Sequence, residues 1–228
     1  HDSGLCGADT MSVTTDGKFL SREAESFVRN NHITENSLFL GAFAYALAKF
    51  NGMTESCFCT VNSGRHDPRL SGSVGMFVKT LPLYFGIDDN MKTAEFLKLV
   101  QSELYGAMKH DCISFGELAA KYGVSTDIAF IYQGEMFDGA ELGDGRIEVK
   151  MLETGDAQSD LDVMVLKTDG GYRLLVHSRR AVYSKALVES FVNMYLNVVG
   201  EMLKADRDFA RAEMGIRDDE KLVLSMGG

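Results

Sequence analysis

The stretch NSLFLGAFAYALAKF, residues 36–50, limits the fold more than any other part of this 228-residue chain. Its length suits a helix, and its apolar side chains would cover nearly every face of that helix instead of one stripe. Thr34 can cap this helix, Glu35 places a negative charge in its first turn, and Asn51-Gly52 ends it. A helix that is apolar all round must be buried, so the rest of the chain has to supply layers that cover it.

The remaining pattern predicts the elements that build those layers. Asp169-Gly170-Gly171 separates two strand-like runs and is a strong hairpin signal, because glycine adopts positive φ at little cost. The stretch VGMFVKTLPLYFGI, residues 74–87, is apolar on both faces, which is typical of a central strand. Pro82 either ends the ladder pairing of that strand or marks an exposed stretch. Further strands are expected near Thr10 to Val13 and in ESCFCTVNSG, TDIAFIYQ, RIEVKMLE, DLDVMVLKT and YRLLVHSRR, with helices at about 21–31, 93–108, 115–122 and 184–204. The order favours one α/β domain in which a mixed sheet packs against helices.

Charge and cysteine content narrow the class of protein. The chain has 33 acidic and 23 basic residues, and a net charge of -10 repels phosphate backbones and anionic lipid, so we expect neither nucleic acid nor a membrane as partner. The first ten residues lack the charged and apolar regions of a signal peptide. Four cysteines are too few for a disulfide scaffold of this length, which favours a reducing, cytoplasmic location.

The chain carries no nucleotide or hydrolase signature. DGKF has Phe19 where a phosphate loop needs Ser or Thr, and no G-x-G-x-x-G follows a predicted strand. SGSVG lacks the glycine that a nucleophile elbow needs two residues before Ser73. Cys57 and Cys59 have the spacing of two zinc ligands, but no second pair lies at ligand spacing, so we interpret them as core thiols.

Three other polar groups have both a catalytic and a simpler interpretation. His110 and Cys112 lie two residues apart and would seldom present their side chains to each other as a thiol nucleophile and its base. Asp160 and Asp162 would share a strand face as an acid/base pair, or merely solvate the opening of a strand. His66 lies in a turn-forming loop. In each case the simpler interpretation is preferred, and from these residues alone only an α/β domain follows.

Three sequence blocks nevertheless resemble a known family. VNSGR at 61–65, VGMFVKTLP at 74–82 and HDCISFGEL at 110–118 resemble v-S-G-R, V-G-x-F-V-N-T-L-P and H-x-x-x-P-F-x-x-L. These are the signature blocks of the second lobe of nonribosomal peptide synthetase condensation domains, in the same order and at similar spacing. The similarity covers about residues 20–225.

The resemblance implies a fold and a domain plan. Condensation domains have two lobes, each similar to chloramphenicol acetyltransferase, so the implied fold is a single acetyltransferase-like α/β lobe. We expect a loosely held N-terminal segment at 1–20, the C-terminal lobe at 21–215, and the start of a connector to a following domain at 216–228.

The resemblance also implies that catalysis requires another part of the protein. The family's catalytic motif, H-H-x-x-x-D-G, lies in the first lobe, and here the histidines are His1, His32, His66, His110 and His177, none adjacent to another. The implied partners are the missing N-terminal lobe, peptidyl carrier domains that bear phosphopantetheine, and a neighbouring adenylation domain. The resemblance implies that this lobe itself binds no cofactor and no metal and supplies no catalytic residue. An exposed lobe interface would also allow dimers.

The same resemblance assigns roles to individual residues. Gly75, Phe77, Lys79 and Thr80 are expected to face the substrate tunnel or a carrier. Lys79 stands where the family usually has Asn, and it would either contact a substrate carbonyl or phosphopantetheine, or extend to solvent. A structural role is expected for Ser63, Gly64, Arg65, His110, Phe115 and Asp160.

Arg65 is expected to tie its loop together by charge-assisted hydrogen bonds, with Asp160 as a candidate partner. Two further departures from the family pattern stand out: Ser114 replaces a proline, and KYGVSTD replaces R-D-x-S-R-N-P-x. The leading hypothesis is half of an amide-forming acyltransferase that is inactive alone. The alternative is a non-catalytic module that binds carriers or serves as a scaffold, while a free acetyltransferase would need its own catalytic histidine.

Overall fold

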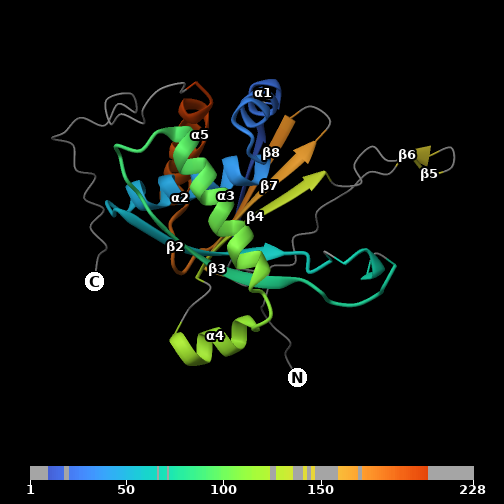
Figure 1. The fold of residues 1–228 in the computed structure, drawn as a ribbon. Helices are drawn as coiled ribbons and strands as arrows, with labels where there is room; N and C mark the ends of the chain where they lie inside the picture. The colour runs from blue at the N-terminus through green and yellow to red at the C-terminus, as the bar shows by residue number, and fades with distance from the viewer. Residues whose placement is uncertain are drawn as a thin grey trace.

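The computed structural model describes residues 10–17, 21–65, 67–70, 72–123, 127–135, 141–142, 145–146, 159–168 and 171–204. Within these residues the chain forms a six-stranded mixed sheet covered by helices, and a separate two-stranded sheet (Figure 1). The elements follow in the order β1 (Thr10–Gly17), α1 (Ser21–Asn31), α2 (Glu35–Phe50), β2 (Glu55–Asn62), η1 (Pro68–Leu70, a 3-10 turn), β3 (Lys79–Gly86), α3 (Thr93–Lys109), α4 (Phe115–Tyr122), β4 (Ile128–Glu135), β5 (Glu141–Leu142), β6 (Gly145–Arg146), β7 (Leu161–Thr168), β8 (Gly171–Arg179) and α5 (Lys185–Lys204).

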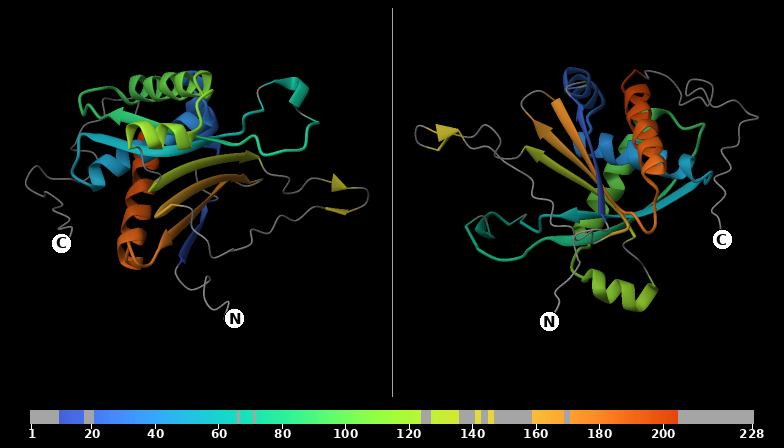
Figure 2. Two further views of the ribbon diagram at one scale, coloured as in Figure 1. Left: turned by 90° about the horizontal axis from the view of Figure 1, so that it is seen from below. Right: turned by 180° about the vertical axis from the view of Figure 1, so that it is seen from behind.

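The large sheet has the strand order β1-β8-β7-β4-β2-β3. Strands β2, β4 and β7 run parallel, whereas β1 with β8, β7 with β8, and β2 with β3 are antiparallel. The predicted α/β class with a mixed sheet packed against helices is therefore confirmed. Because strands β2, β4 and β7 are parallel, their carboxyl ends all lie at the same end of the sheet. The chain between β2 and β3 projects beyond this end (Figure 2).

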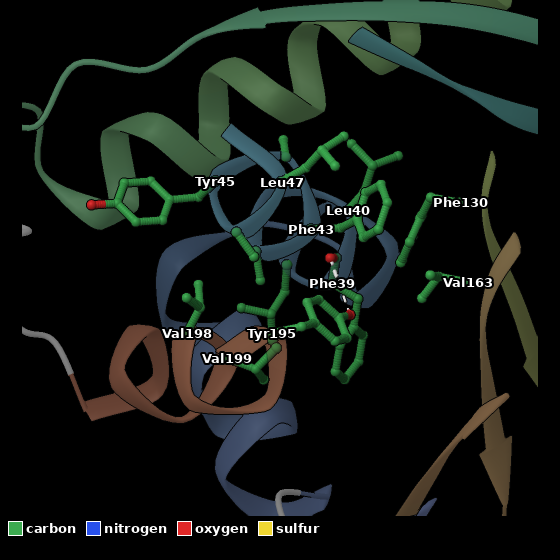
Figure 3. Close-up of a cluster of buried hydrophobic side chains, with 14 of the residues drawn as sticks. Phe39, Leu40, Phe43, Tyr45, Leu47, Phe130, Val163, Tyr195, Val198 and Val199 are labelled. Atoms are coloured by element: carbon green, nitrogen blue, oxygen red, sulfur yellow. Dashed lines mark hydrogen bonds between the residues drawn. The ribbon is translucent and has the colours of Figure 1, made fainter. Parts of the chain in front are cut away.

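Helix α2 lies at the centre of the hydrophobic core, as its sequence predicted. Every residue from Ser37 to Ala48 is buried, and α2 packs against α3, α5 and the strands β2 and β4 (Figure 3). Phe43 is the hub of the aromatic contacts, with ring centroids 4.9 Å from Phe58 and 5.1 Å from Phe130. The hydroxyl of Tyr195 on α5 donates to the backbone oxygen of Phe39 at 3.3 Å. Helices from both ends of the chain thus close around α2.

The local signals in the sequence correspond to observed boundaries. The Thr34 hydroxyl caps α2 by accepting from the backbone N–H of Ser37 at 3.1 Å. Strands β7 and β8 pair down to Thr168 and Gly171, as a hairpin requires. The predicted helices at 21–31, 93–108, 115–122 and 184–204 are all present. Strand β6 ends at Arg146, and the remainder of the strand predicted in RIEVKMLE lies outside the described residues.

The prediction of a central strand at residues 74–87 is wrong. Only Lys79–Gly86 forms a strand, β3, and this strand is at the edge of the sheet, paired with β2 alone. Pro82 does not end the ladder pairing, which continues to Gly86. It is compatible with an edge position, because proline has no N–H to donate to a second neighbouring strand. Apolar residues on both faces suggested burial on both faces, but in this chain the first part of the run lies beyond the sheet, in solvent.

A partly buried polar cluster attaches the beginning of α2 to the carboxyl ends of β4 and β7. Glu35 accepts hydrogen bonds from the Tyr132 hydroxyl and, at 3.0 Å, from Lys167 Nζ. Burial opposes ionisation of Glu35, but the hydrogen bonds from Tyr132 and Lys167 and the positive charge of Lys167 outweigh it and hold the pKa of Glu35 below its ordinary value. Burial and the charge of Glu35 raise the pKa of Tyr172. The cluster therefore binds Glu35 in its charged form.

Replacing Glu35 with glutamine should destabilise the protein at pH 7 by roughly 1–2 kcal/mol, because charged hydrogen bonds are lost. The folded-state pKa of Glu35 is lowered, so its contribution is present above the ordinary pKa of 4.5 and is lost as the pH falls through the folded-state value. Urea unfolding at pH 7 and pH 3 should show that Glu35→Gln lowers the free energy of unfolding less at pH 3 than at pH 7. Glu103→Gln, on the exposed side of α3, is the matched control and should change little. Equal destabilisation by Glu35→Gln at both pH values would contradict the ionic role.

Candidate functional site

The residues that the sequence singled out lie mainly where β2 ends and β3 begins. Between these strands, residues 63–78 form a projection that we call the 63–78 arm, of which residues 66 and 71 lie outside the described residues. The arm extends beyond the carboxyl end of β2 and away from the helices (Figure 1). Gly64, Arg65, Gly75 and Phe77 belong to it, and Lys79 and Thr80 open β3.

Arg65 organises the interior of the arm. Its Nη1 donates to the backbone oxygens of Leu70 at 2.7 Å and Ser73 at 2.9 Å, and its Nη2 donates to that of Gly75 at 3.3 Å. The guanidinium carbon lies 4.5 Å from the ring centroid of Phe77. The planar, multiply donating guanidinium thus fixes three carbonyls and one aromatic ring around a single side chain.

The glycines of the arm permit this close packing. Gly64 has a φ of 65°, and a Cβ there would lie 2.1 Å from the backbone oxygen of Phe77. Ser63 accepts at its hydroxyl from the backbone N–H of Arg65 at 3.4 Å, which begins the turn. The sequence Ser-Gly-Arg therefore has a structural reason: a turn, a position without a side chain, and a cation that holds the returning segment of the arm.

Asp111 holds together the two ends of the arm, at Asn62 on β2 and Lys79 on β3, and we call this place the neck of the arm. Lys79 Nζ donates to the Asp111 backbone oxygen at 2.7 Å and to its Oδ1 at 3.0 Å. Asn62 is buried, and its Nδ2 donates to Asp111 Oδ2 at 3.0 Å. Asn62 and Lys79 are directly opposite each other on β2 and β3, so Asp111, in the turn between α3 and α4, fastens both ends of the arm at once.

These contacts add a partner that neither prediction for Lys79 included. Its ammonium pairs with Asp111, while its side chain stays 43% exposed. Sequence reasoning missed both Asn62 and Asp111 as site residues. The one available signal was a polar residue at the end of a buried strand, next to the Ser-Gly-Arg turn.

The other predicted residues of this region lie close to the ends of the arm. Thr80 is half-buried and lies opposite Val61 on β2, while His110 is exposed and ends α3. Phe115 begins α4 and is half-buried. His110 and Phe115 thus flank the turn that carries Asp111, close to the neck of the arm.

Ser114, which occupies the position of a proline in the resembled pattern, forms the N-cap of α4. Its hydroxyl accepts from the backbone N–H of Glu117 at 3.3 Å, and the Glu117 carboxylate accepts from the Ser114 backbone N–H at 2.9 Å. Hydrogen bonds from the Ser114 backbone and side chain hold the pKa of Glu117 below its ordinary value. This reciprocal capping box gives the substitution a structural explanation.

The suggested contact between Arg65 and Asp160 is wrong. Asp160 Oδ1 lies 3.1 Å from Nη1 of Arg179 instead. The reason is topological: Asp160 precedes β7 and so lies at the amino end of the parallel strands, whereas Arg65 follows the carboxyl end of β2. Burial raises the pKa of the neighbouring Asp162, although Ser159, His177 and Arg179 favour its carboxylate.

In the described part of the chain, the interpretation of Cys57 and Cys59 as core thiols is right for Cys59 and wrong for Cys57. Cys57 is exposed, Cys59 is buried, and burial raises the pKa of the Cys59 thiol to about 11. Among the described residues, no group of three His, Cys, Asp or Glu side chains is arranged to hold a metal ion. In the same residues, no helix combines the length and apolar character needed to span a bilayer.

Solved structures that share this fold include condensation domains. The chain matches a holo four-domain nonribosomal peptide synthetase bound to AMP and glycine with a TM-score of 0.76 and 17% identity, over 88% of this chain and 17% of that one. It matches the condensation domain of the monacolin K polyketide synthase MokA with a TM-score of 0.74 and 17% identity, over 86% of this chain and 47% of that one. At this level of identity the matches establish the fold, that of one half of such a domain.

The family follows from the sequence. The family model described as "Condensation domain" matches residues 5–224, nearly the whole chain. The chain therefore belongs to the condensation domain family, which confirms the resemblance drawn from its three sequence blocks.

The relatives are much longer proteins. The hybrid PKS-NRPS synthetase pydA of Acremonium sp is 24% identical over 202 residues, which cover 85% of this chain and 5% of that protein. Bacitracin synthase 3 of Bacillus licheniformis is 21% identical over 222 residues, which cover 94% of this chain and 4% of that protein. The chain thus spans only about one-twentieth of the length of these synthetases.

Replacing Arg65 with alanine should loosen the arm without unfolding the protein. The three carbonyl contacts and the ring contact are lost together, so backbone amides of residues 72–78 should exchange with solvent about tenfold faster or more. The free energy of unfolding measured in urea should change by less than about 1 kcal/mol, because the arm lies outside the core. Arg69→Ala is the matched control, since Arg69 is in the same arm but binds Asp67 on the surface. Equal exchange in the two variants would contradict the organising role of Arg65.

A double-mutant cycle should detect the closure of the neck. Lys79→Ala and Asp111→Ala should each destabilise the protein, and their coupling energy should be about 1 kcal/mol, since the pair is charged but partly exposed. The same cycle on Arg65 and Asp160 should give no coupling. Denaturant unfolding of the single and double variants measures both. If Lys79 and Asp111 act additively, the neck is not fastened by this pair.

Proposed function

We propose that this chain is the C-terminal lobe of a condensation domain in a nonribosomal peptide synthetase or a hybrid synthetase. In that role it helps to join two carrier-tethered acyl or aminoacyl thioesters: the acceptor amine attacks the donor thioester, an amide bond forms and the donor thiol leaves. The lobe supplies one wall of the reaction chamber. The single observation that carries the proposal is a fold match that spans nearly all of this chain but about half of a condensation domain.

The proposed partners follow from that role. The lobe would pack against the N-terminal lobe of the same domain, which would hold the histidine that orients or deprotonates the amine. Carrier domains would deliver the substrates on phosphopantetheine, and an adenylation domain would follow the connector at 216–228. The lobe would bind no cofactor of its own. Residues 21–215 would form the lobe, residues 1–20 its N-terminal segment, and the protein would work in the cytoplasm, in keeping with its free thiols.

The geometry of the arm supports a positioning role for this region in place of a chemical one. The guanidinium of Arg65 and the ammonium of Lys79 are both engaged by groups of this chain. We therefore assign Arg65 and Lys79 to shaping the wall, with Gly75, Phe77 and Thr80 along it. A wall held by such contacts would place tethered reactants with little loss of freedom during the reaction.

Transfer between loaded carriers tests the proposal. In the full-length protein that contains this chain, a donor carrier loaded with an acyl thioester should pass its acyl group to an aminoacyl-loaded acceptor carrier. Intact-protein mass spectrometry should show the acceptor gaining the mass of the donor acyl group. Leaving the acceptor without its amino acid is the control and should abolish the gain. Hydrolysis of the donor without any gain on the acceptor would count against the proposal.

The 228-residue chain alone should leave the same loaded carriers unchanged, since the catalytic group is assigned to the other lobe. A second candidate, a binding module without catalysis, is favoured by one neighbour. The X-domain from teicoplanin biosynthesis was solved in complex with OxyB, and it matches with a TM-score of 0.71 and 17% identity, over 92% of this chain and 48% of that one. A full-length protein that holds loaded carriers but transfers nothing would support this second function.

A further inference from the structure

A histidine and an aspartate face each other across two strands, at the start of β7 and the end of β8. Asp162 and His177 are directly opposite in the antiparallel register, and both are half-buried. Val163 and Val176, their neighbours in the sequence, belong to the core around α2. Because side chains alternate along a strand, Asp162 and His177 lie together on the face of the sheet turned away from α2, with Cβ atoms about 5 Å apart.

The carboxylate of Asp162 depends on its neighbours for compensation. Burial raises its pKa, whereas a hydrogen bond from Ser159 and the positive charges of His177 and Arg179 favour the ionised form. The positions that flank the pair on the neighbouring strands hold uncharged residues, Ala129 on β4 and Ser12 on β1. Loss of either positive charge therefore leaves a half-buried carboxylate less well compensated.

The two positive charges respond differently to pH. Arg179 keeps its charge throughout the physiological range, and its Nη1 also pairs with Asp160 at 3.1 Å. Histidine, by contrast, ordinarily gains or loses its proton between about pH 5 and 8. Among the described residues, the other ionisable groups near this end of the sheet bring no positive charge: Cys59, Asp127, Asp160 and Tyr183. The compensation of Asp162 therefore varies with the protonation of His177.

The pair adjoins a junction that connects the sheet to α5. The backbone N–H of Arg179 donates to the backbone oxygen of Asp160 at 3.0 Å. The backbone oxygen of Arg179 accepts from the N–H groups of Val182 at 3.1 Å and Tyr183 at 3.0 Å, in the turn that leads to α5. The start of β7, the end of β8 and the entry to α5 thus meet beside the pair. We call residues 159–162 and 177–183 the β7–α5 junction.

We infer that Asp162 and His177 form a pH-responsive clamp on the β7–α5 junction. With His177 protonated, its cation and the Asp162 carboxylate attract each other across the strands, where water screens the charges only in part. With His177 neutral, this attraction is lost and the carboxylate is less well compensated. Acidification through the range in which histidine takes up its proton therefore tightens the junction. The inference goes beyond the proposed function and does not depend on it.

Hydrogen–deuterium exchange of the full-length protein, read by mass spectrometry at pH 6 and pH 8, tests the clamp. After correction for intrinsic exchange rates, backbone amides of the junction should be protected about threefold more at pH 6, as expected for a cross-strand charge pair. His177→Gln should abolish this dependence. His110→Gln is the matched control and should keep it, because His110 is exposed at the end of α3. The same pH dependence in His177→Gln and in the unmodified protein would overturn the inference.

A double-mutant cycle separates the clamp from a general loss of structure. Asp162→Asn and the double variant are compared with His177→Gln by the same exchange measurement. The coupling between the two positions should be about threefold in the opening constant at pH 6 and should disappear at pH 8, because a neutral imidazole has no net charge to attract the carboxylate. Loosening that one substitution causes by itself cancels from the coupling. A coupling that is equal at both pH values, or absent from both, would refute the clamp.

Discussion

The structure depends on the burial of one helix. Helix α2 carries apolar groups all around its surface, and water is excluded from it only if other elements surround it completely. The sheet covers one side through Phe58 and Phe130, and α3 and α5 cover the others. Helix α2 precedes every strand of the six-stranded sheet except β1, so most of the elements that cover it come later in the chain. The parallel arrangement of β2, β4 and β7 brings their carboxyl ends together at one end of the sheet.

This end of the sheet holds the polar contacts that shape the candidate site. Glu35 links α2 to β4 and β7, and Asp111 links the turn after α3 to β2 and β3. Both carboxylates are held by charged and neutral donors from different elements, so they fix elements that apolar packing alone would leave free to shift. The 63–78 arm can project beyond the sheet as an ordered structure because its neck is held in this way.

The departures from the family pattern are matched by partners within this chain. Lys79 replaces an asparagine and meets Asp111, and Ser114 replaces a proline and meets Glu117. Lys79 joins two segments that are far apart in the sequence, whereas Ser114 and Glu117 form a local cap. The two positions therefore keep a structural role, and neither change indicates a decayed fold.

The sequence by itself determined the local structure and the family. Periodicity and capping residues predicted α1 to α5 and the β7–β8 hairpin, because the interactions that set helix ends and tight turns lie within a few residues. The Ser-Gly-Arg turn and its neighbouring blocks identified the condensation domains. Tertiary structure alone decided which strand lies at the edge, which partners Arg65 and Lys79 bind, and that Val74 and Met76 face solvent. These outcomes depend on which segments meet in space, and an apolar residue or a charged one looks the same in sequence whether its partner is core, solvent or another polypeptide.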